Sequence, residues 1–276
     1  MILVSGATGN VGGALVRTLV EAGEEVRALT RSADHASLPA GVEPVTGDLN
    51  HPATLSAALV DVRGVFLLAG YEDMPGLLAA IRGAGVRRVA LLSSGCVADG
   101  DMSNAVVRYN ALSEAAVRES GVAWTILRPS GFMSNALRWR PQLQAGDVVR
   151  VPFADVPIAA IDPRDLAAVA ARVLTADGHE GHSYMLTGPE PLLPADQVAV
   201  LAEVLGRDLR LEAQANEEAR AEMSAVMAPE YVDAMFSFFV DGTFDDSKVR
   251  PTVQEILGRE PRTFEQWATA HADAFR

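Results

Sequence analysis

The sequence is poor in lysine, cysteine and long apolar runs. Lys248 is the only lysine among 23 basic residues, so any reaction that needs a lysine must use it. Cys96 is the only cysteine, which excludes an intramolecular disulfide and a zinc site built from cysteines. The longest apolar stretches, such as 65–69 and 167–171, fall far short of the ~18 residues that a membrane helix needs. We therefore expect no membrane-spanning segment.

Basic charge is also scarce relative to acidic charge. The 276 residues include 36 acidic and 23 basic ones, for a formal net charge of −13. Such a surface repels a phosphate backbone on average, so nucleic acid is a poor candidate partner. Hydrophobic residues make up 49% of the chain, enough for a sizeable globular core. Met1 leads straight into an apolar strand without a basic leader, and we expect a cytoplasmic monomer or homodimer.

The first half alternates short apolar runs with segments of helical period, which is typical of βαβ units that feed a parallel sheet. The pattern predicts strands over 2–5, 25–30, 43–46, 64–68, 88–93 and 123–127, and helices over 10–22, 52–59, 74–84 and 103–120. Prolines interrupt the later part, which we expect to be mostly helical, with Asp162 and Thr263 as helix caps. The expected fold is α/β, with a Rossmann-like doubly wound parallel sheet. Residues 1–150 form its main domain, 151–190 return to it, and 191–276 form a helical cap.

A glycine-rich turn follows the first predicted strand. Residues 6–12 read Gly-Ala-Thr-Gly-Asn-Val-Gly between a strand and a helix, which is the context of a dinucleotide-binding turn. Gly6 permits the tight turn, Gly9 lets the backbone approach a pyrophosphate, and Gly12 lets helix and strand pack closely. The residues of this turn expected to contact the cofactor are Gly6, Thr8, Gly9, Asn10 and Val11.

The end of the second predicted strand bears on which dinucleotide binds. An acidic residue there would bind the ribose 2′-hydroxyl of NAD, but the sequence has Thr30-Arg31-Ser32. Because a guanidinium group pairs well with a 2′-phosphate, Arg31 favours NADP(H) as the cofactor. The alternative is a surface arginine at the end of a strand.

Several segments together resemble those of NmrA-like atypical short-chain dehydrogenases/reductases. They are the glycine turn, Thr30-Arg31, Gly47-Asp48-Leu49, Leu91-Leu92-Ser93-Ser94, and the runs 114–135, 161–167, 184–189 and 258–264. The resemblance covers nearly the whole chain. It implies a Rossmann-like fold with NAD(P) lying across the strand ends.

The resemblance also implies roles for residues that follow the later strands. Those matching the family's cofactor contacts are Asp48, Leu49, Leu68, Ala69, Gly70, Ser93, Ser94 and Pro129. Those leading to the substrate side are Phe132, Met133 and Asn135. The alternatives are a turn or helix cap for Asp48, and an ordinary turn for the loop after Leu68.

The proton relay of standard short-chain reductases is missing. Those enzymes use Tyr-x-x-x-Lys, in which the lysine lowers the tyrosine pKa. Here Tyr109 is followed four positions later by Ser113, and Lys248 lies in a polar segment typical of the surface. Hydride transfer needs no lysine, but a reduced ketone or quinone still needs a proton. The possible donors are Ser93, Ser94, Tyr109, water and a hydroxyl group of the substrate, and we take Ser94 and Tyr109 as the candidate catalytic residues.

These observations predict an NADPH-dependent reductase of a carbonyl or quinone group on a bulky, aromatic small molecule. A tailoring ketoreductase of antibiotic biosynthesis fits this description, as does a general quinone or azo reductase. The substrate would lie between segment 132–139 and a helical cluster of Met223, Met227, Met235, Phe236, Phe238 and Phe239. The alternative is that this cluster is core, as such stripes more often are. The five histidines are scattered, so no metal site is expected. The alternative function is a non-catalytic NADP(H)-binding redox sensor.

Overall fold

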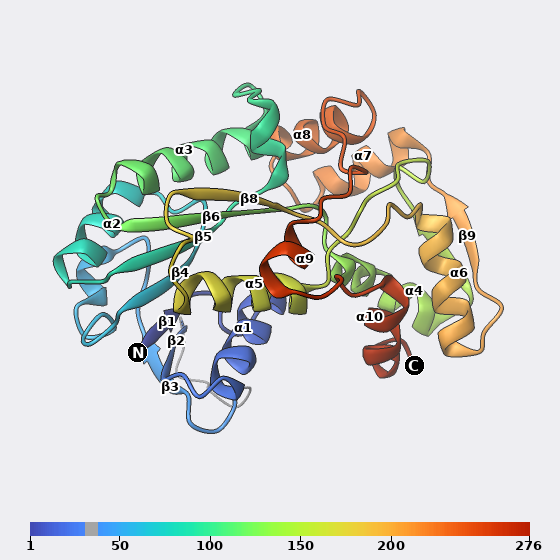
Figure 1. Cartoon of the computed structure of the whole chain (residues 1–276). Coiled ribbons are helices and arrows are strands. Elements are labelled where there is room, and N and C mark those ends of the chain that lie inside the picture. Colours follow the sequence, from blue (N-terminus) through green and yellow to red (C-terminus); the bar gives the residue numbers. More distant parts are fainter. Residues whose placement is uncertain (31–37) are drawn as a thin grey trace.

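The computed structural model describes residues 1–30 and 38–276, and a parallel sheet of seven strands organises it (Figure 1). The strand order is β3-β2-β1-β4-β5-β6-β8. The strands are β1 Ile2–Val4, β2 Val26–Thr30, β3 Glu43–Thr46, β4 Gly64–Leu68, β5 Arg88–Leu92, β6 Ala123–Pro129 and β8 His182–Leu186. The order reverses between β1 and β4, which creates a crevice at their carboxyl ends where such sheets bind ligands.

Helices cover both faces of this sheet, which explains why its central strands are apolar throughout. Helices α1 Asn10–Glu21 and α5 Pro163–Thr175 pack on one face, and α2 Met74–Gly83 and α3 Ala105–Glu119 on the other (Figure 1). A separate hydrophobic core lies on each side of the sheet. The predicted Rossmann-like doubly wound sheet is confirmed.

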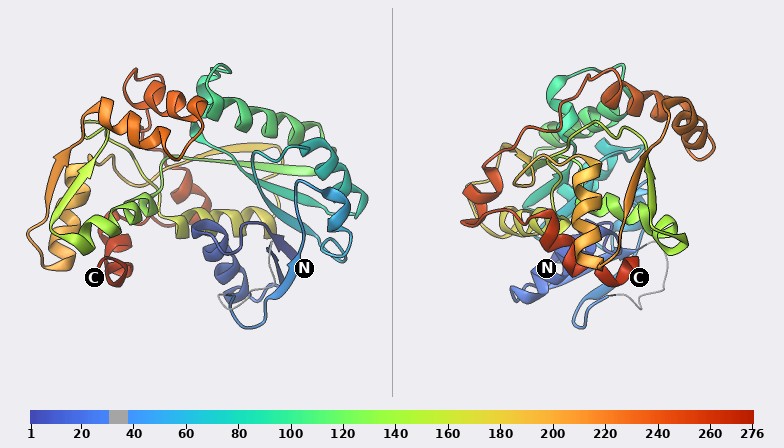
Figure 2. Two further views of the ribbon diagram at one scale, coloured as in Figure 1. Left: turned by 180° about the vertical axis from the view of Figure 1, so that it is seen from behind. Right: turned by 90° about the vertical axis from the view of Figure 1, so that its right-hand side faces the viewer.

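The C-terminal region is mostly helical and lies beyond one end of the sheet (Figure 2). A two-stranded parallel sheet joins β7 Val148–Val151 to β9 Arg210–Ala213. The helices here are α4 Arg140–Ala145, α6 Pro194–Leu205, α7 Asn216–Ser224, α8 Pro229–Phe239 and α10 Phe264–Ala270, whereas α9 Thr252–Leu257 packs against α5 on the main sheet. A third core forms around the buried rings of Phe264, Trp267 and Phe275.

Short 3₁₀ helices connect several of these elements. They are η1 Pro52–Leu55, η2 Gly95–Asp99, η3 Met133–Trp139 and η4 Ala272–Phe275. The α-helix expected over 52–59 is therefore wrong, because only its first turn is helical and that turn is 3₁₀. The expectation for the second half missed strands β7, β8 and β9, which have four or five residues each and lie outside the regular alternation of strands and helices that revealed the equally short β3 and β4.

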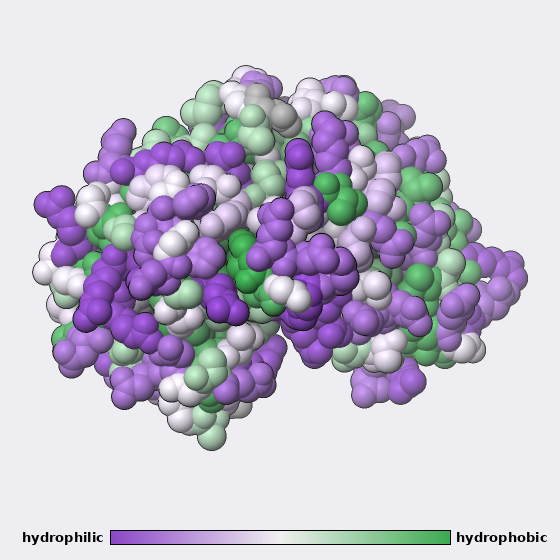
Figure 3. All heavy atoms as spheres, viewed as in Figure 1, coloured by the Kyte–Doolittle hydropathy of each residue, from purple (hydrophilic) through white to green (hydrophobic). Residues whose placement is uncertain are grey.

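The two predicted helix caps are confirmed. The Asp162 side chain accepts a hydrogen bond from the Arg164 amide at 2.8 Å at the start of α5. Thr263 and Gln266 form a reciprocal capping box at the start of α10. Hydrophilic side chains cover most of the face seen in Figure 3. Within the described ranges, no helix is both long and apolar enough to cross a membrane.

Candidate active site

The glycine turn between β1 and α1 has a backbone that only glycine fits. Gly6 has a φ of +62°, and a Cβ at Gly12 would lie 2.1 Å from the Gly6 carbonyl oxygen. The Gly9 amide donates to the same oxygen at 2.9 Å, which closes the turn. Gly9 is the N-cap of α1, and no side chain caps the helix there. Its first amides and its dipole are thus suited to a phosphate group.

Two cavities of about 450 Å³ each lie at the carboxyl ends of the strands, and Leu68 at the end of β4 borders both. The first, beside the glycine turn, is lined by Gly6, Thr8, Leu29, Thr30, Gly47, Asp48, Leu49, Asn50, Leu68 and Tyr71. The second, between the sheet and α8, includes Ala69, Ser93, Ser94, Tyr109, Pro129, Phe132 and Asn135 from the predicted set. A dinucleotide that passes Leu68 would have one half in each cavity.

The other predicted site residues lie outside these two cavities. Gly9 and Asn10 border a smaller cavity of about 250 Å³ on the far side of the turn, and Val11 is buried. Gly70 packs against the ring of Tyr109, and Met133 is buried in the C-terminal core. Arg31, the residue expected to select NADP(H), lies outside the described residues.

Ser93 is bound to a buried charge cluster that the sequence did not predict. Its hydroxyl donates to Glu114 Oε1 at 2.6 Å. Arg128 donates to both Glu114 oxygens, at 2.8 and 2.6 Å, and Arg118 donates to Oε2 at 2.7 Å. Burial raises the pKa of Glu114, but the hydrogen bonds from Arg128, Ser93 and Arg118 outweigh it, so the pKa lies below its usual value. An arginine within an otherwise apolar strand was the available signal.

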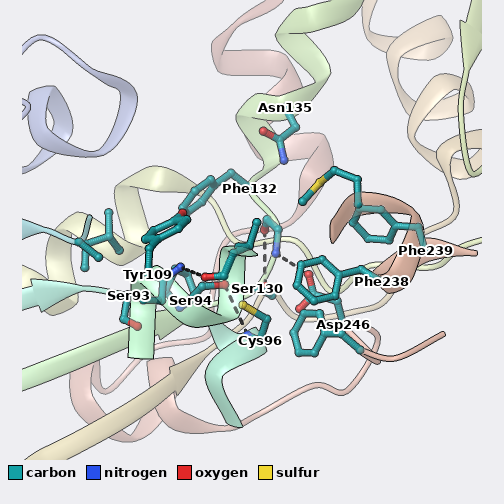
Figure 4. Close-up of a pocket in the computed structure, with 18 of the residues that line it drawn as sticks. Ser93, Ser94, Cys96, Tyr109, Ser130, Phe132, Asn135, Phe238, Phe239 and Asp246 are labelled. Atoms are coloured by element: carbon teal, nitrogen blue, oxygen red, sulfur yellow. Dashed lines mark hydrogen bonds between the residues drawn. The ribbon is translucent and has the colours of Figure 1, made fainter. Parts of the chain in front are cut away.

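Ser94 begins η2 at the edge of the second cavity. Its Oγ accepts a weak hydrogen bond from the Cys96 amide at 3.4 Å (Figure 4). This contact uses an oxygen lone pair and leaves the hydroxyl hydrogen able to donate. Ser94 is partly exposed, unlike Ser93, so the two neighbouring serines have different surroundings.

Tyr109 projects from α3 into the same cavity and packs edge-on against Tyr231, with ring centroids 6.4 Å apart. Burial is the main cause that raises the pKa of its phenol, which therefore stays protonated. Ser113, at the position of the missing lysine, has a structural role. Its hydroxyl donates to the Tyr109 carbonyl at 2.8 Å and accepts from the Gly70 amide at 3.0 Å. This pair of bonds ties α3 to the loop after β4.

Asp246, in the loop after α8, is a second acid that the sequence did not predict. It borders the second cavity, and its Oδ2 accepts a hydrogen bond from the Gly131 amide at 2.7 Å (Figure 4). Burial raises the pKa of Asp246 to about 7. Its place in the polar run Asp245-Asp246-Ser247-Lys248 resembled an ordinary exposed loop.

Only part of the expected methionine and phenylalanine cluster reaches the cavity. Met235, Phe238 and Phe239 from α8 line it, together with Phe244 from the next loop. Phe236 and Met223 pack in a separate small cluster. The cavity thus has an apolar wall on the α8 side, and polar groups from η2, α3 and the loop after α8.

Comparisons with known proteins agree with this geometry. The model of an NAD(P)H-binding family matches residues 6–177. The chain is 41% identical to a (4-alkanoyl-5-oxo-2,5-dihydrofuran-3-yl)methyl phosphate reductase of Streptomyces griseus, over 100% of this chain and 99% of that protein. It is 37% identical to an NAD(P)H azoreductase of Xenophilus azovorans, again over 100% and 99%.

A solved structure shares the fold over nearly the whole chain. The NADPH-dependent quinone oxidoreductase of Escherichia coli, complexed with NADPH, matches with a TM-score of 0.79 at 24% identity, over 98% of this chain and 99% of that one. The family match and the two relatives together identify the cofactor class and the kind of reaction. The chain belongs to the NAD(P)H-binding atypical short-chain dehydrogenases/reductases and is an NAD(P)H-dependent reductase.

Proposed function

We propose that this reductase uses NADPH to reduce a bulky conjugated carbonyl compound, such as a quinone or a polycyclic aromatic ketone. The observation that carries the proposal is the second cavity, in which Met235, Phe238 and Phe239 face a polar side. Its volume of about 450 Å³, part of which the nicotinamide half of the cofactor would fill, falls within the range of small-molecule sites. The apolar wall suits a flat ring system, while the hydroxyls of Ser94 and Tyr109 suit a substrate oxygen.

The residues around the two cavities fit the proposed cofactor. The glycine turn and the start of α1 would hold the pyrophosphate, with Asp48 and Leu49 on the adenine side and Pro129 against the nicotinamide. Bound there, NADPH supplies the hydride. The preference for NADPH over NADH rests on Arg31 and the absence of an acid at the end of β2.

The missing lysine favours a substrate that forms a weakly basic anion when it accepts the hydride. Hydride addition to an isolated ketone leaves an alkoxide, which is about as basic as hydroxide. Hydride transfer to one oxygen of a quinone leaves a phenolate at the other oxygen, and the conjugate acid of a phenolate has a pKa of about 10, like that of tyrosine. A weaker proton donor suffices in the second case. The names of the two relatives, an azo reductase and an alkanoyl-oxo-dihydrofuran reductase, also indicate unsaturated, electron-poor acceptors.

One feature at the cavity edge suits a substrate with an anionic group. Asn135 and Arg138 are three residues apart on η3, so in a 3₁₀ helix they share one face, and both border the second cavity. Among the described residues no carboxylate pairs with Arg138. The phosphate in the name of the Streptomyces griseus relative is a group of the kind that such an arginine binds. Phosphorylated substrates therefore belong in the test.

The test follows the loss of NADPH absorbance with quinones, polycyclic aromatic ketones and a phosphorylated acyl furanone, with NADH in parallel. We expect turnover with NADPH, faster for quinones than for ketones. Arg31→Ala should weaken NADPH binding far more than NADH binding, whereas Arg87→Ala, an exposed arginine elsewhere, should change neither. Tight NADPH binding without turnover would instead favour the redox sensor. Equal losses for both cofactors in Arg31→Ala would contradict the role of Arg31.

A further inference from the structure

Asp246 places a carboxyl group in the wall of the proposed substrate cavity. Its Oδ2 accepts a hydrogen bond from the Gly131 amide at 2.7 Å, and its backbone carbonyl accepts one from the Ala159 amide at 2.8 Å. The first bond fixes the loop after α8 to the turn that follows Pro129, and the second fixes it to the segment that precedes α5. Figure 4 shows the carboxyl group beside Phe238, facing the turn at Ser130. The acid is therefore held where the proposed substrate meets the cofactor.

No ion pair neutralises this carboxyl group within the described part of the chain. Lys248 of the same loop pairs with Asp245 instead, at 3.3 Å. Arg138 on η3 borders the cavity but forms no ion pair with Asp246. Nothing but the Gly131 amide is hydrogen-bonded to the carboxyl oxygens among the described residues, and this leaves Oδ1 to carry a proton.

We propose that Asp246 is the catalytic acid that protonates the substrate during its reduction. This proposal rests on the proposed function. It supplies the step for which standard short-chain reductases use the Tyr-x-x-x-Lys pair. Ser94 and Tyr109 then act as hydrogen-bond donors to the substrate oxygen.

The protonation state of Asp246 suits this role. Burial raises its pKa to about 7, against the opposing effect of the Gly131 hydrogen bond, and the charge of Asp245 raises it further. Among the described residues, the other titratable side chains that border the cavity are Tyr109 on α3, Cys96 on η2 and Arg138 on η3, and α8 contributes none. Because burial raises the phenol pKa of Tyr109, Asp246 is the stronger acid of the two. An acid with a pKa near the working pH is the most effective proton donor.

The atoms and charges of the step balance. A ketone gains the hydride at its carbonyl carbon, and the electron pair of the C=O bond moves to oxygen. A quinone gains the hydride at one carbonyl oxygen, and the electron pair moves through the ring to the other oxygen. The proton on Oδ1 of Asp246 passes to the oxygen that received the electron pair, which leaves Asp246 as a carboxylate with Oδ2 still bound to Gly131. Water then returns a proton to the carboxylate. Each turnover thus consumes one hydride and one proton.

The matched variants are Asp246→Asn and Asp245→Asn. Asparagine keeps an oxygen that accepts from the Gly131 amide but has no acidic proton, so the turn should be preserved. Asp245 is the adjacent acid, exposed and bound to Ser247 and Lys248, and makes no contribution to the cavity. Both variants and the wild type are assayed with one quinone and one aromatic ketone between pH 5.5 and 9.

We expect Asp246→Asn to lower kcat by about 10²–10⁴-fold with the ketone and by less with the quinone. The kcat/KM of the wild type should fall tenfold per pH unit above about 7, while that of Asp246→Asn should stay flat. Asp245→Asn should keep the kcat of the wild type at low pH, with the fall shifted slightly to lower pH because the charge of Asp245 no longer raises the pKa of Asp246. Infrared difference spectra of the protein alone provide a readout besides activity. A protonated-carboxyl band should disappear with a midpoint near pH 7 in the wild type and at slightly lower pH in Asp245→Asn, and it should be absent from Asp246→Asn.

Two results would overturn the inference while leaving the proposed function intact. In the first, the wild type reduces the substrate and Asp246→Asn has the same kcat and the same pH profile. The other is an infrared spectrum in which no carboxyl band of Asp246 titrates near pH 7. A wild type that reduces none of the compounds would instead refute the proposed function, and the inference with it.

Discussion

Two carboxyl groups lie close to the substrate cavity, and their surroundings are opposite. Glu114 is fully buried behind Ser93 and receives hydrogen bonds from two arginines and a serine. Asp246 lines the cavity and receives one hydrogen bond from an amide. Consequently the pKa of Glu114 lies below its usual value, whereas that of Asp246 is raised to about 7. The number of donors decides whether a buried acid keeps its charge or its proton.

This difference in pKa suits Glu114 to a structural role and Asp246 to a chemical one. The Glu114 cluster connects α3 to β6, the strand that ends at Pro129, and so fixes the turn on which the nicotinamide is proposed to lie. A permanently charged group suits this purpose, because its bonds do not change with pH in the neutral range. Asp246 has no arginine partner among the described residues, and so can exchange a proton there.

The largest expected effect comes from breaking the first cluster. Arg128→Met removes two of the hydrogen bonds of Glu114 and leaves a buried carboxylate with Arg118 and Ser93 alone. We expect a loss of about 3–5 kcal/mol in the free energy of unfolding, because breaking a buried pair leaves a charge without compensation. Urea unfolding at pH 7 measures it.

The matched control is the double variant Glu114→Gln with Arg128→Met. It removes the buried charge together with its partner, so it should recover much of the stability lost in the single variant. A single variant within about 1 kcal/mol of the wild type would contradict the scaffold role of the cluster.

A smaller effect, of opposite sign, is expected from Asp246→Asn. The pKa of Asp246 is about 7 when folded, above the ~3.9 of an unfolded aspartate. Between these pH values the unfolded chain releases a proton that the folded chain retains, so the wild type loses stability as the pH rises from 4 to 7. Asparagine has no such loss. We expect the free energy of unfolding of Asp246→Asn to exceed that of the wild type by about 2 kcal/mol at pH 8, after allowing for solvent that reaches the cavity. At pH 4 the difference should be much smaller.

Urea unfolding at several pH values tests this prediction. Asp245→Asn should show no gain in the free energy of unfolding at pH 8, because hydrogen bonds donated by Ser247 keep the pKa of Asp245 below its usual value. A difference between Asp246→Asn and the wild type that is the same at pH 4 and pH 8 would mean that Asp246 titrates normally, and the comparison with Glu114 would fail.

The sheet and the glycine turn were predictable from the sequence because their signals are local. A strand buried on both faces is apolar throughout, as in 64–68, and Gly6 and Gly12 stand where any side chain would be strained or clash. The strand β7 gave a weaker signal, since Val148 is exposed and Val149 is buried within only four residues. A four-residue pattern alone does not identify a strand, and β7 lacks the regular strand–helix alternation that supported the equally short β3.

The two acids beside the cavity could not be predicted because their partners are distant in the chain. Asp246 and Gly131 are 115 residues apart, and only the packed loop brings them together. Glu114 and Arg128 are 14 residues apart, on a helix and the following strand. Local sequence shows the polar character of each residue but not the number of donors it meets, and that number determines its pKa.

The smallest expected effects separate the two neighbouring serines. Ser93→Ala removes one donor of Glu114 and should lower the free energy of unfolding by about 1 kcal/mol. Ser94→Ala should leave stability within about 0.5 kcal/mol, since its bond to the Cys96 amide is long, but lower kcat by about tenfold through a lost bond to the substrate oxygen. Urea unfolding and steady-state kinetics of both variants measure these effects. If Ser93→Ala lowers kcat as strongly as Ser94→Ala, then the Ser93 hydroxyl leaves Glu114 during the reaction, and the Glu114 cluster takes part in the chemistry that we assign to Asp246.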